Sequence, residues 1–261
     1  MFGSSAIVPQ PANGYVIPVV GDVVITQRET FPPEVGIITN ATLTSGTFAI
    51  NGFPAFGGQQ ITKFATPTAT GAVDAATAVT AGDIMVVNTT ANPTSQKYDW
   101  HMVTTGAAVN NADLRLDGAN AAPSYVVGSK FSTIAPTDTS AVNGSSAVVG
   151  SVSGGINFVV GDLVFAKVAA NADSLGSYAW HVVTTAQNIT TDIAPTTLRL
   201  DGAAAVPTFV PASQISKLTP SAEGPSDGSD ATAFSFGDII LAKTTANASN
   251  NNAYAFHMVS G

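Results

Sequence analysis

The histidines are the residues of this chain best suited to chemistry, because all three occupy the same position of one repeated pattern. His101, His181 and His257 each follow an aromatic residue and precede two apolar residues. Imidazole nitrogens bind zinc and other transition metals, so three histidines related by an internal threefold axis would form a metal site. The strand alternation argues against that site, because His101 shares one face with Asp99 and Val103 while the aromatic residues lie on the other. We therefore expect each histidine to hydrogen-bond within its sheet or to a neighbouring unit, and we expect neither a metal ion nor another cofactor.

An aspartate that follows a glycine precedes each histidine by 18 or 19 residues. These aspartates are Asp83, Asp162 and Asp238. Carboxylates at turns suit calcium, but calcium repeats carry several oxygen ligands at short spacing, and the sequence has no such run. We expect these carboxylates instead to accept backbone N–H groups in the turn before each strand. Asp117 and Asp201, which stand in Asp-Gly pairs, have the same expected role in their own turns.

Two arginines also occupy equivalent positions. Arg115 and Arg199 each lie between two leucines on an expected strand. A guanidinium on the polar face of such a strand either pairs with a carboxylate of the same chain or lies in a subunit interface, where arginine is favoured. Both alternatives stay open at this point, so both residues are interface candidates. Neither alternative implies catalysis.

Catalytic sequence patterns do not occur in the chain. It has no Gly-x-Ser-x-Gly elbow, no Walker sequence and no His-Glu-x-x-His. Sugar hydrolysis needs two carboxylates in one cleft, but the three glutamates, Glu29, Glu34 and Glu223, lie outside the repeated pattern. We therefore expect no catalytic residue and no enzyme activity.

The aromatic residue before each histidine has two possible roles. Exposed side chains of Trp100, Trp180 and Phe256 would stack on sugar rings or nucleobases. Each is bracketed by apolar residues on its own face of the strand. This pattern favours packing in a core.

The elements that position these residues form one unit that recurs along the chain. Each copy begins with Gly-Asp and an apolar strand and continues with the histidine strand. Residues 114–119 and 198–203 then repeat Leu-Arg-Leu-Asp-Gly-Ala, a short alternating strand that enters a tight turn. A third strand pattern follows at 130–134 and, more loosely, at 215–219. Arrays of one unit usually serve as surfaces and spacers.

The first copy is degenerate but follows the same order, with segments at 21–25, 35–39, 48–52 and 61–64. The aspartates of the four Gly-Asp pairs, at positions 22, 83, 162 and 238, are 61, 79 and 76 residues apart.

These spacings divide the chain into five parts. They are an N-terminal arm (1–20), a degenerate repeat (21–81), two full repeats (82–160 and 161–236) and a partial repeat (237–261). Alternatively the units are permuted by half, which predicts that the last hairpin pairs with strands near the N-terminus.

The predicted fold class is all-β, with internally repeated units resembling sandwiches or barrels and an extended N-terminal arm. Valine, isoleucine, threonine and aromatic residues alternate with Gly, Pro, Asn and Ser clusters at spacings typical of such folds. The one helix candidate is the alanine-rich segment 72–79. Asparagine-rich connectors at 89–96, 171–177 and 247–252 are expected to be exposed hairpin loops.

Composition limits the range of partners. Nine basic and seventeen acidic residues give a net charge of −8, which disfavours nucleic acid and anionic membranes as partners. Charged residues make up only 10% of the chain, so surface polarity must come from Thr, Ser, Asn and the backbone. The chain has no cysteine, no apolar run long enough to span a bilayer and no signal-peptide pattern at its start.

Taken together, the cysteine-free composition rich in Thr, Ala, Asn and Gly, the Gly-Asp strands and the Leu-Arg-Leu-Asp-Gly turns resemble those of decoration (cement) proteins on tailed-bacteriophage virions. The resemblance is one of style across the whole chain, and no binding residue is carried over. It implies a β-rich virion protein, often a trimer, that binds the major capsid protein and clamps neighbouring capsid subunits together.

Under this resemblance the proline-containing arm would supply contacts to the capsid. Its apolar residues Phe2, Ile7, Val8 and Tyr15 are the interface candidates there. The alternative function is a tail-fibre or adhesin module that recognises a receptor or glycan through the asparagine-rich loops.

Overall fold

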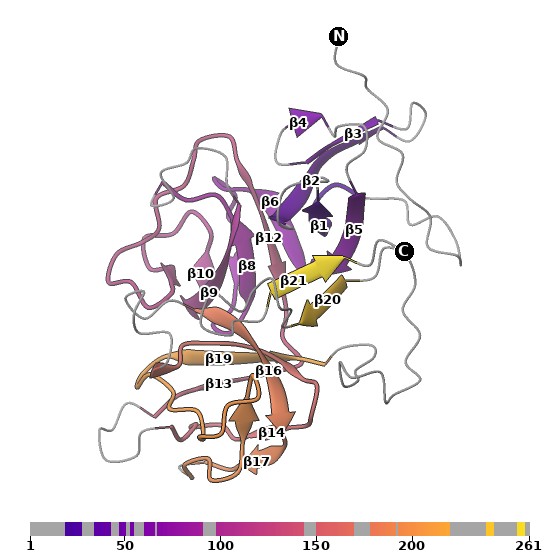
Figure 1. Ribbon diagram of the computed structural model, residues 1–261. Coiled ribbons are helices and arrows are strands. Elements are labelled where there is room, and N and C mark those ends of the chain that lie inside the picture. Colours follow the sequence, from indigo (N-terminus) through magenta and orange to yellow (C-terminus); the bar gives the residue numbers. More distant parts are fainter. Residues whose placement is uncertain are drawn as a thin grey trace.

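The computed structural model describes residues 19–27, 34–42, 47–50, 53–54, 60–65, 67–90, 98–143, 150–169, 178–191, 193–219, 239–242 and 255–258. Every regular element in these segments is a β-strand, and all the strand pairings are antiparallel, which confirms the all-β prediction. The same segments hold no helix with the length and apolarity needed to cross a membrane. Figure 1 shows the strands gathered into groups that follow one another along the chain.

The second group, unit 2, has a five-stranded sheet in the order β11-β9-β8-β12-β6 and a two-stranded ribbon of β7 and β10. Its strands are β6 (Ala69–Ala72), β7 (Ala78–Val79), β8 (Ile84–Val87), β9 (Asp99–Thr105), β10 (Ala107–Ala108), β11 (Arg115–Leu116) and β12 (Lys130–Ile134). Strands β6 and β7 precede Gly82, where the repeated pattern starts, and belong to the unit by their pairing.

Unit 3 repeats this arrangement. Its sheet has the order β18-β16-β15-β19-β13, and β14 and β17 form its ribbon. The strands are β13 (Asp138–Ala141), β14 (Ile156–Phe158), β15 (Leu163–Ala166), β16 (Ala179–Thr185), β17 (Gln187–Ile189), β18 (Arg199–Leu200) and β19 (Gln214–Leu218). The register is also the same, since His101 pairs with Met85 in unit 2 and His181 pairs with Val164 in unit 3.

Unit 1 carries the degenerate copy. Its sheet has the order β4-β3-β2-β1-β5. The strands are β1 (Val23–Gln27), β2 (Glu34–Thr42), β3 (Thr47–Ile50), β4 (Phe53–Pro54) and β5 (Gln60–Ala65). The series β3-β2-β1-β5 matches β11-β9-β8-β12, so the alignment of the degenerate copy is confirmed at the level of strand order.

The last strands, β20 (Ile239–Ala242) and β21 (Ala255–Met258), form a hairpin in which Ile240 pairs with His257. In the described residues these two strands pair with each other, and no described pairing joins them to the N-terminal strands.

The helix candidate at 72–79 is wrong. Ala72 ends β6, the amide of Ala75 donates to the carbonyl of Ala72 in a turn (3.0 Å), and Ala78–Val79 forms β7. Eight residues are too few to stabilise an isolated helix. The β-branched residues and the pairing of β7 with β10 favour the extended form.

The central strands β8 and β15 of the five-stranded sheets of units 2 and 3 are buried on both faces. In β8, Met85 and Val87 face the core between the sheet and its own ribbon. Ile84 and Val86 face a second core that the three units share. Such two-sided burial explains why the sequence of this strand is an uninterrupted apolar run rather than an alternating one.

The shared core joins units that are far apart in the sequence. Its buried members are Val23, Ile37, Ile84, Val86, Tyr98, Met102, Ile134, Phe165 and Trp180. Trp100 of unit 2 meets Trp180 of unit 3 edge to face, with ring centroids 5.4 Å apart. The predicted core packing is therefore confirmed for Trp180, while Trp100 is partly buried and packs against the same core. The side chain of Phe256 lies outside the described ones.

Candidate functional site

The Asp-Gly pair after β11 forms a tight turn. The amide of Ala119 donates to the carbonyl of Leu116 (3.0 Å), and φ is +56° at Asp117 and +78° at Gly118. Two consecutive left-handed residues define a type I′ turn, and aspartate is one of the few L residues that tolerate this conformation. The turn at residues 200–203 has the same hydrogen bond and the same signs of φ. Both predicted turns are confirmed, but the carboxylates of their aspartates bind the neighbouring histidine strand, which was not their expected role.

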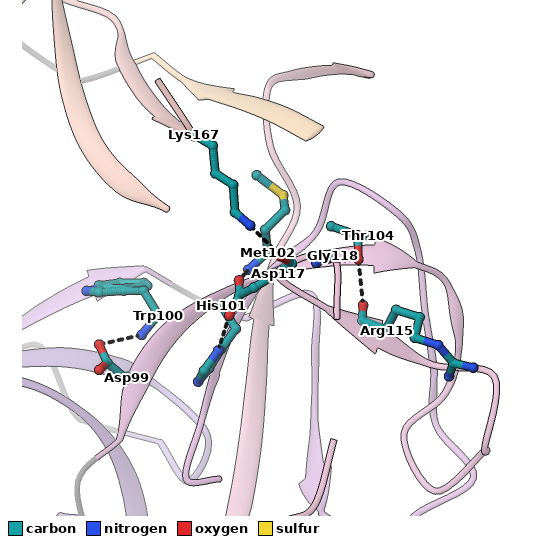
Figure 2. A network of polar contacts seen from close by, with 9 residues as sticks. All are labelled: Asp99, Trp100, His101, Met102, Thr104, Arg115, Asp117, Gly118 and Lys167. Atoms are coloured by element: carbon teal, nitrogen blue, oxygen red, sulfur yellow. Dashed lines mark hydrogen bonds and ion pairs between the residues drawn. The ribbon is translucent and has the colours of Figure 1, made fainter. Parts of the chain in front are cut away.

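Each turn aspartate binds a histidine. Asp117 Oδ2 lies 2.7 Å from Nδ1 of His101, and Asp117 Oδ1 accepts the backbone N–H of Met102 at 2.8 Å (Figure 2). In unit 3, Asp201 Oδ2 lies 2.5 Å from Nδ1 of His181, and Asp201 Oδ1 accepts the backbone N–H of Val182 at 2.9 Å. Because an ionised carboxylate only accepts, Nδ1 carries the proton in both pairs. These histidines were expected to hydrogen-bond within their sheet or to a neighbouring unit, and each binds the turn aspartate of its own unit.

Further contacts hold the turn of unit 2 in place. The hydroxyl of Thr104 accepts the Gly118 N–H at 3.0 Å and donates to the Arg115 carbonyl at 3.2 Å. Lys167, which follows β15 in unit 3, reaches across to donate to the Asp117 carbonyl at 2.7 Å (Figure 2). The turn therefore fixes the histidine of its own unit and also contacts the next unit.

A histidine bound to an aspartate is the orienting half of a nucleophile-activating triad. A catalytic base, however, must reach the proton that it removes. Nε2 of His101 is enclosed, and the described residues place no hydrogen-bond partner on it. No nucleophile therefore stands at this pair in the described part of the chain.

The metal hypothesis finds no support in the described residues, since no three His, Asp or Glu side chains there lie close enough together to hold an ion. His101 and His181 are each engaged by an aspartate through Nδ1. His257 lies on β21, but its side chain is outside the described ones.

The aspartates of the Gly-Asp pairs have the predicted turn role. The carboxylates of Asp22, Asp83 and Asp162 each accept a backbone N–H from the third residue before them, at 2.8 to 2.9 Å. Burial raises the pKa of Asp83, and the hydrogen bond from the Thr80 amide opposes that rise. Asp238 lies outside the described residues.

The arginines contact carbonyl oxygens of their own chain. Arg115 Nη1 donates to the carbonyls of Ala112 (2.5 Å) and Leu114 (2.8 Å). Arg199 Nη1 donates to the carbonyl of Leu198 at 2.9 Å. The intrachain contact is thus made, and among the described residues its acceptors are backbone carbonyls rather than carboxylates. The other interface candidates, Phe2, Ile7, Val8 and Tyr15, lie outside the described residues.

Comparison with known families, curated proteins and solved structures gives no match. The units themselves supply the useful comparison, because contacts that recur between them mark what the architecture requires.

One recurring contact was missed in the sequence, and we call it the unit lock. In each lock a serine of one unit donates its hydroxyl to the carbonyl of the Gly-Asp glycine in the preceding unit. Ser132 binds Gly21 at 2.7 Å, and Ser216 binds Gly82 at 2.5 Å. The available signal was a serine at the same place of the strands β12 and β19, which pair in the same register with β8 and β15.

The turn before β19 carries a strained alanine. Ala212 has φ +61° in the turn 210–213, where the amide of Ser213 donates to the Val210 carbonyl (3.2 Å). The equivalent residue of unit 2 is Gly128, with φ +78°. We expect Ala212→Gly to raise the free energy of unfolding by about 1 kcal/mol, because glycine adopts this conformation without strain. The reciprocal Gly128→Ala, whose new methyl group would meet nothing within 4 Å, should lower it by a similar amount. Denaturant unfolding checks both, and equal stability of the two variants and the parent would contradict this reading.

One buried and two half-buried tyrosines are expected to make the protein lose stability at alkaline pH. Burial raises the pKa of Tyr125 from 10.0 to about 12, and it also raises the pKa values of Tyr98 and Tyr178. The folded state keeps these phenol protons where the unfolded chain loses them. This contribution is therefore complete below the ordinary pKa and is lost as the pH rises from about 10 to about 12. Phenolate absorbance followed together with unfolding should show these tyrosines ionising as the protein unfolds.

Two phenylalanine substitutions separate the effects. The Tyr125 hydroxyl is buried without a hydrogen-bond partner in the described residues, so Tyr125→Phe should keep or raise stability at neutral pH. Tyr98→Phe should lower it by about 1 kcal/mol, because the Lys130 amide loses its acceptor at 3.0 Å. The opposite order would overturn this assignment.

Proposed function

We propose that this chain is a structural virion protein that decorates the outside of a phage capsid and cements neighbouring capsid subunits. Its partners would be the major capsid protein and further copies of itself, with a trimer favoured. The mechanism is adhesive, since many weak contacts multiplied over a lattice give high avidity without any single strong site.

The observation that carries the proposal is the fusion of repeated units into one body. A shared apolar core and two unit locks connect units 1, 2 and 3, so the units are not independent domains joined by flexible linkers. A clamp must transmit force between the points that it joins, and a continuous core does this better than separate domains. The recurring Asp-Gly turns of units 2 and 3 are buttressed alike, as expected of a scaffold that presents equivalent surfaces.

The test is quantitative mass spectrometry of purified particles from the native source, with the copies of this protein counted relative to the major shell protein. A copy number commensurate with the shell is the expected result. A handful of copies per particle would favour the receptor- or glycan-binding fibre module, and absence from every particle would overturn the virion proposal.

A further inference from the structure

The two Asp-Gly turns contain a bond sequence that can rearrange spontaneously, and their contacts in the fold bear on that reaction. Residues 114–119 and 198–203 have the identical sequence Leu-Arg-Leu-Asp-Gly-Ala. Among the pairs that begin with aspartate, Asp-Gly is the most prone to spontaneous backbone rearrangement, because glycine has no side chain to hinder attack by its amide nitrogen. The intrinsic reactivity of the two sites is the same, so any difference between them comes from the structure.

The reaction needs no enzyme and no co-reactant except water. The amide nitrogen of the glycine attacks Cγ of the aspartic acid, a C–N bond forms, and the carboxyl hydroxyl leaves as water with the amide proton. The resulting succinimide ring then adds water at one of its two carbonyls. One opening restores aspartate, and the other places the side-chain carbon in the backbone as isoaspartate.

The contacts of the turn oppose each step of this approach. The attacking nitrogen, that of Gly118, is tied by its N–H to Thr104 Oγ1 at 3.0 Å. The target carboxylate is anchored through both oxygens, by the Met102 amide at 2.8 Å and by His101 Nδ1 at 2.7 Å. Cγ cannot swing onto the nitrogen until these hydrogen bonds break.

The second turn is closed in the same way. Gly202 donates its N–H to Thr184 Oγ1 at 3.0 Å. Both oxygens of Asp201 are engaged, by the Val182 amide at 2.9 Å and by His181 Nδ1 at 2.5 Å. Its carboxylate is less exposed, at 23% of its side-chain surface against 36% for Asp117.

We propose that Asp117 and Asp201 are latent isoaspartate sites, that Thr104 and Thr184 hold them closed, and that modification at either site records the opening of its own turn. The histidine–aspartate pairs then have two roles, because each histidine restrains the carboxylate of its aspartate and also orders the sheet. An isoaspartate would lengthen the turn backbone by one carbon and displace the carboxylate from its histidine. The modification would therefore weaken the turn that it enters.

The experiment is prolonged incubation of the whole folded protein at neutral pH, with site-resolved mass spectrometry that separates isoaspartate from aspartate peptides. A synthetic Leu-Arg-Leu-Asp-Gly-Ala peptide is the unprotected reference for both sites, since both share its sequence. We expect each site in the folded protein to react at least about tenfold more slowly than the peptide. Reaction of both sites at the rate of the peptide would overturn the proposal.

Variants of the two threonines locate the protection. Thr104→Val keeps the shape of the side chain but removes the acceptor, so isoaspartate should form about five- to tenfold faster at Asp117 and at an unchanged rate at Asp201. Thr184→Val should give the mirror image, and Thr104→Ser, which keeps the hydroxyl, should behave as the parent. Equal acceleration at both sites would mean that global unfolding controls the reaction, and no acceleration would mean that the threonine protects nothing; either result refutes the local mechanism.

Discussion

Gly82→Ala is expected to lower the free energy of unfolding by about 3 to 5 kcal/mol, because it breaks the lock between units 2 and 3. Gly82 has φ +96°, which strains any L residue, and a Cβ there would lie only 2.3 Å from Thr139 Oγ1 and 2.9 Å from its Cβ. The carbonyl of Gly82 also accepts the Ser216 hydroxyl, so movement away from the threonine would break that hydrogen bond. Denaturant unfolding measures the loss.

Two controls separate strain from collision. Gly202→Ala introduces an alanine at φ +71° with nothing within 4 Å, so it should cost only about 1 kcal/mol. In a double-mutant cycle, Thr139→Ala should recover part of the Gly82→Ala loss by removing the closest atoms. Purely additive losses would show that the two residues do not collide and would contradict the lock geometry.

Lys217→Met is expected to destabilise the protein by about 3 kcal/mol, because it leaves a buried carboxylate without its cation. Asp162 is fully buried, and Lys217 Nζ lies 3.4 Å from its Oδ2. The carboxylate keeps the Val159 amide at 2.9 Å and the Thr219 hydroxyl at 3.2 Å, which limits the loss. Removal of the lysine also frees the Asn157 carbonyl, its acceptor at 2.7 Å.

Lys167→Met is the matched control, because this lysine donates to a carbonyl rather than to a carboxylate. It should cost about 1 kcal/mol. Comparable losses in the two lysine variants would mean that the charge of Asp162 is compensated by its other donors.

The sequence predicted features that depend on local chemistry. The Asp-Gly turns were predictable because few L residues accept two consecutive left-handed conformations, and Asp117 and Asp201 do so next to glycine. The placement of the His101 and Trp100 side chains on opposite faces of their strand followed from strand alternation alone. Four strands of the degenerate copy were found because their order along the chain matches that of the later copies.

Features that depend on distant residues were not predictable. Ser132 and Gly21 are 111 residues apart, and nothing in either local sequence marks their contact. The pairing of each histidine with a turn aspartate was not predictable, because the two residues are 16 or 20 residues apart and lie in different elements. The incorrect helix at 72–79 shows that alanine content decides little when a neighbouring strand offers hydrogen bonds.

The direction of the unit locks has a consequence for how the chain acquires its structure on the ribosome. In both locks the donor belongs to the later unit, 111 or 134 residues after its acceptor. At synthesis rates of about 5 to 20 residues per second, the Gly21 carbonyl waits roughly 6 to 22 seconds for its serine to be made. During translation the apolar face of unit 1, and then that of unit 2, is therefore exposed until the following unit emerges and covers it. The nascent chain must stay soluble for that time.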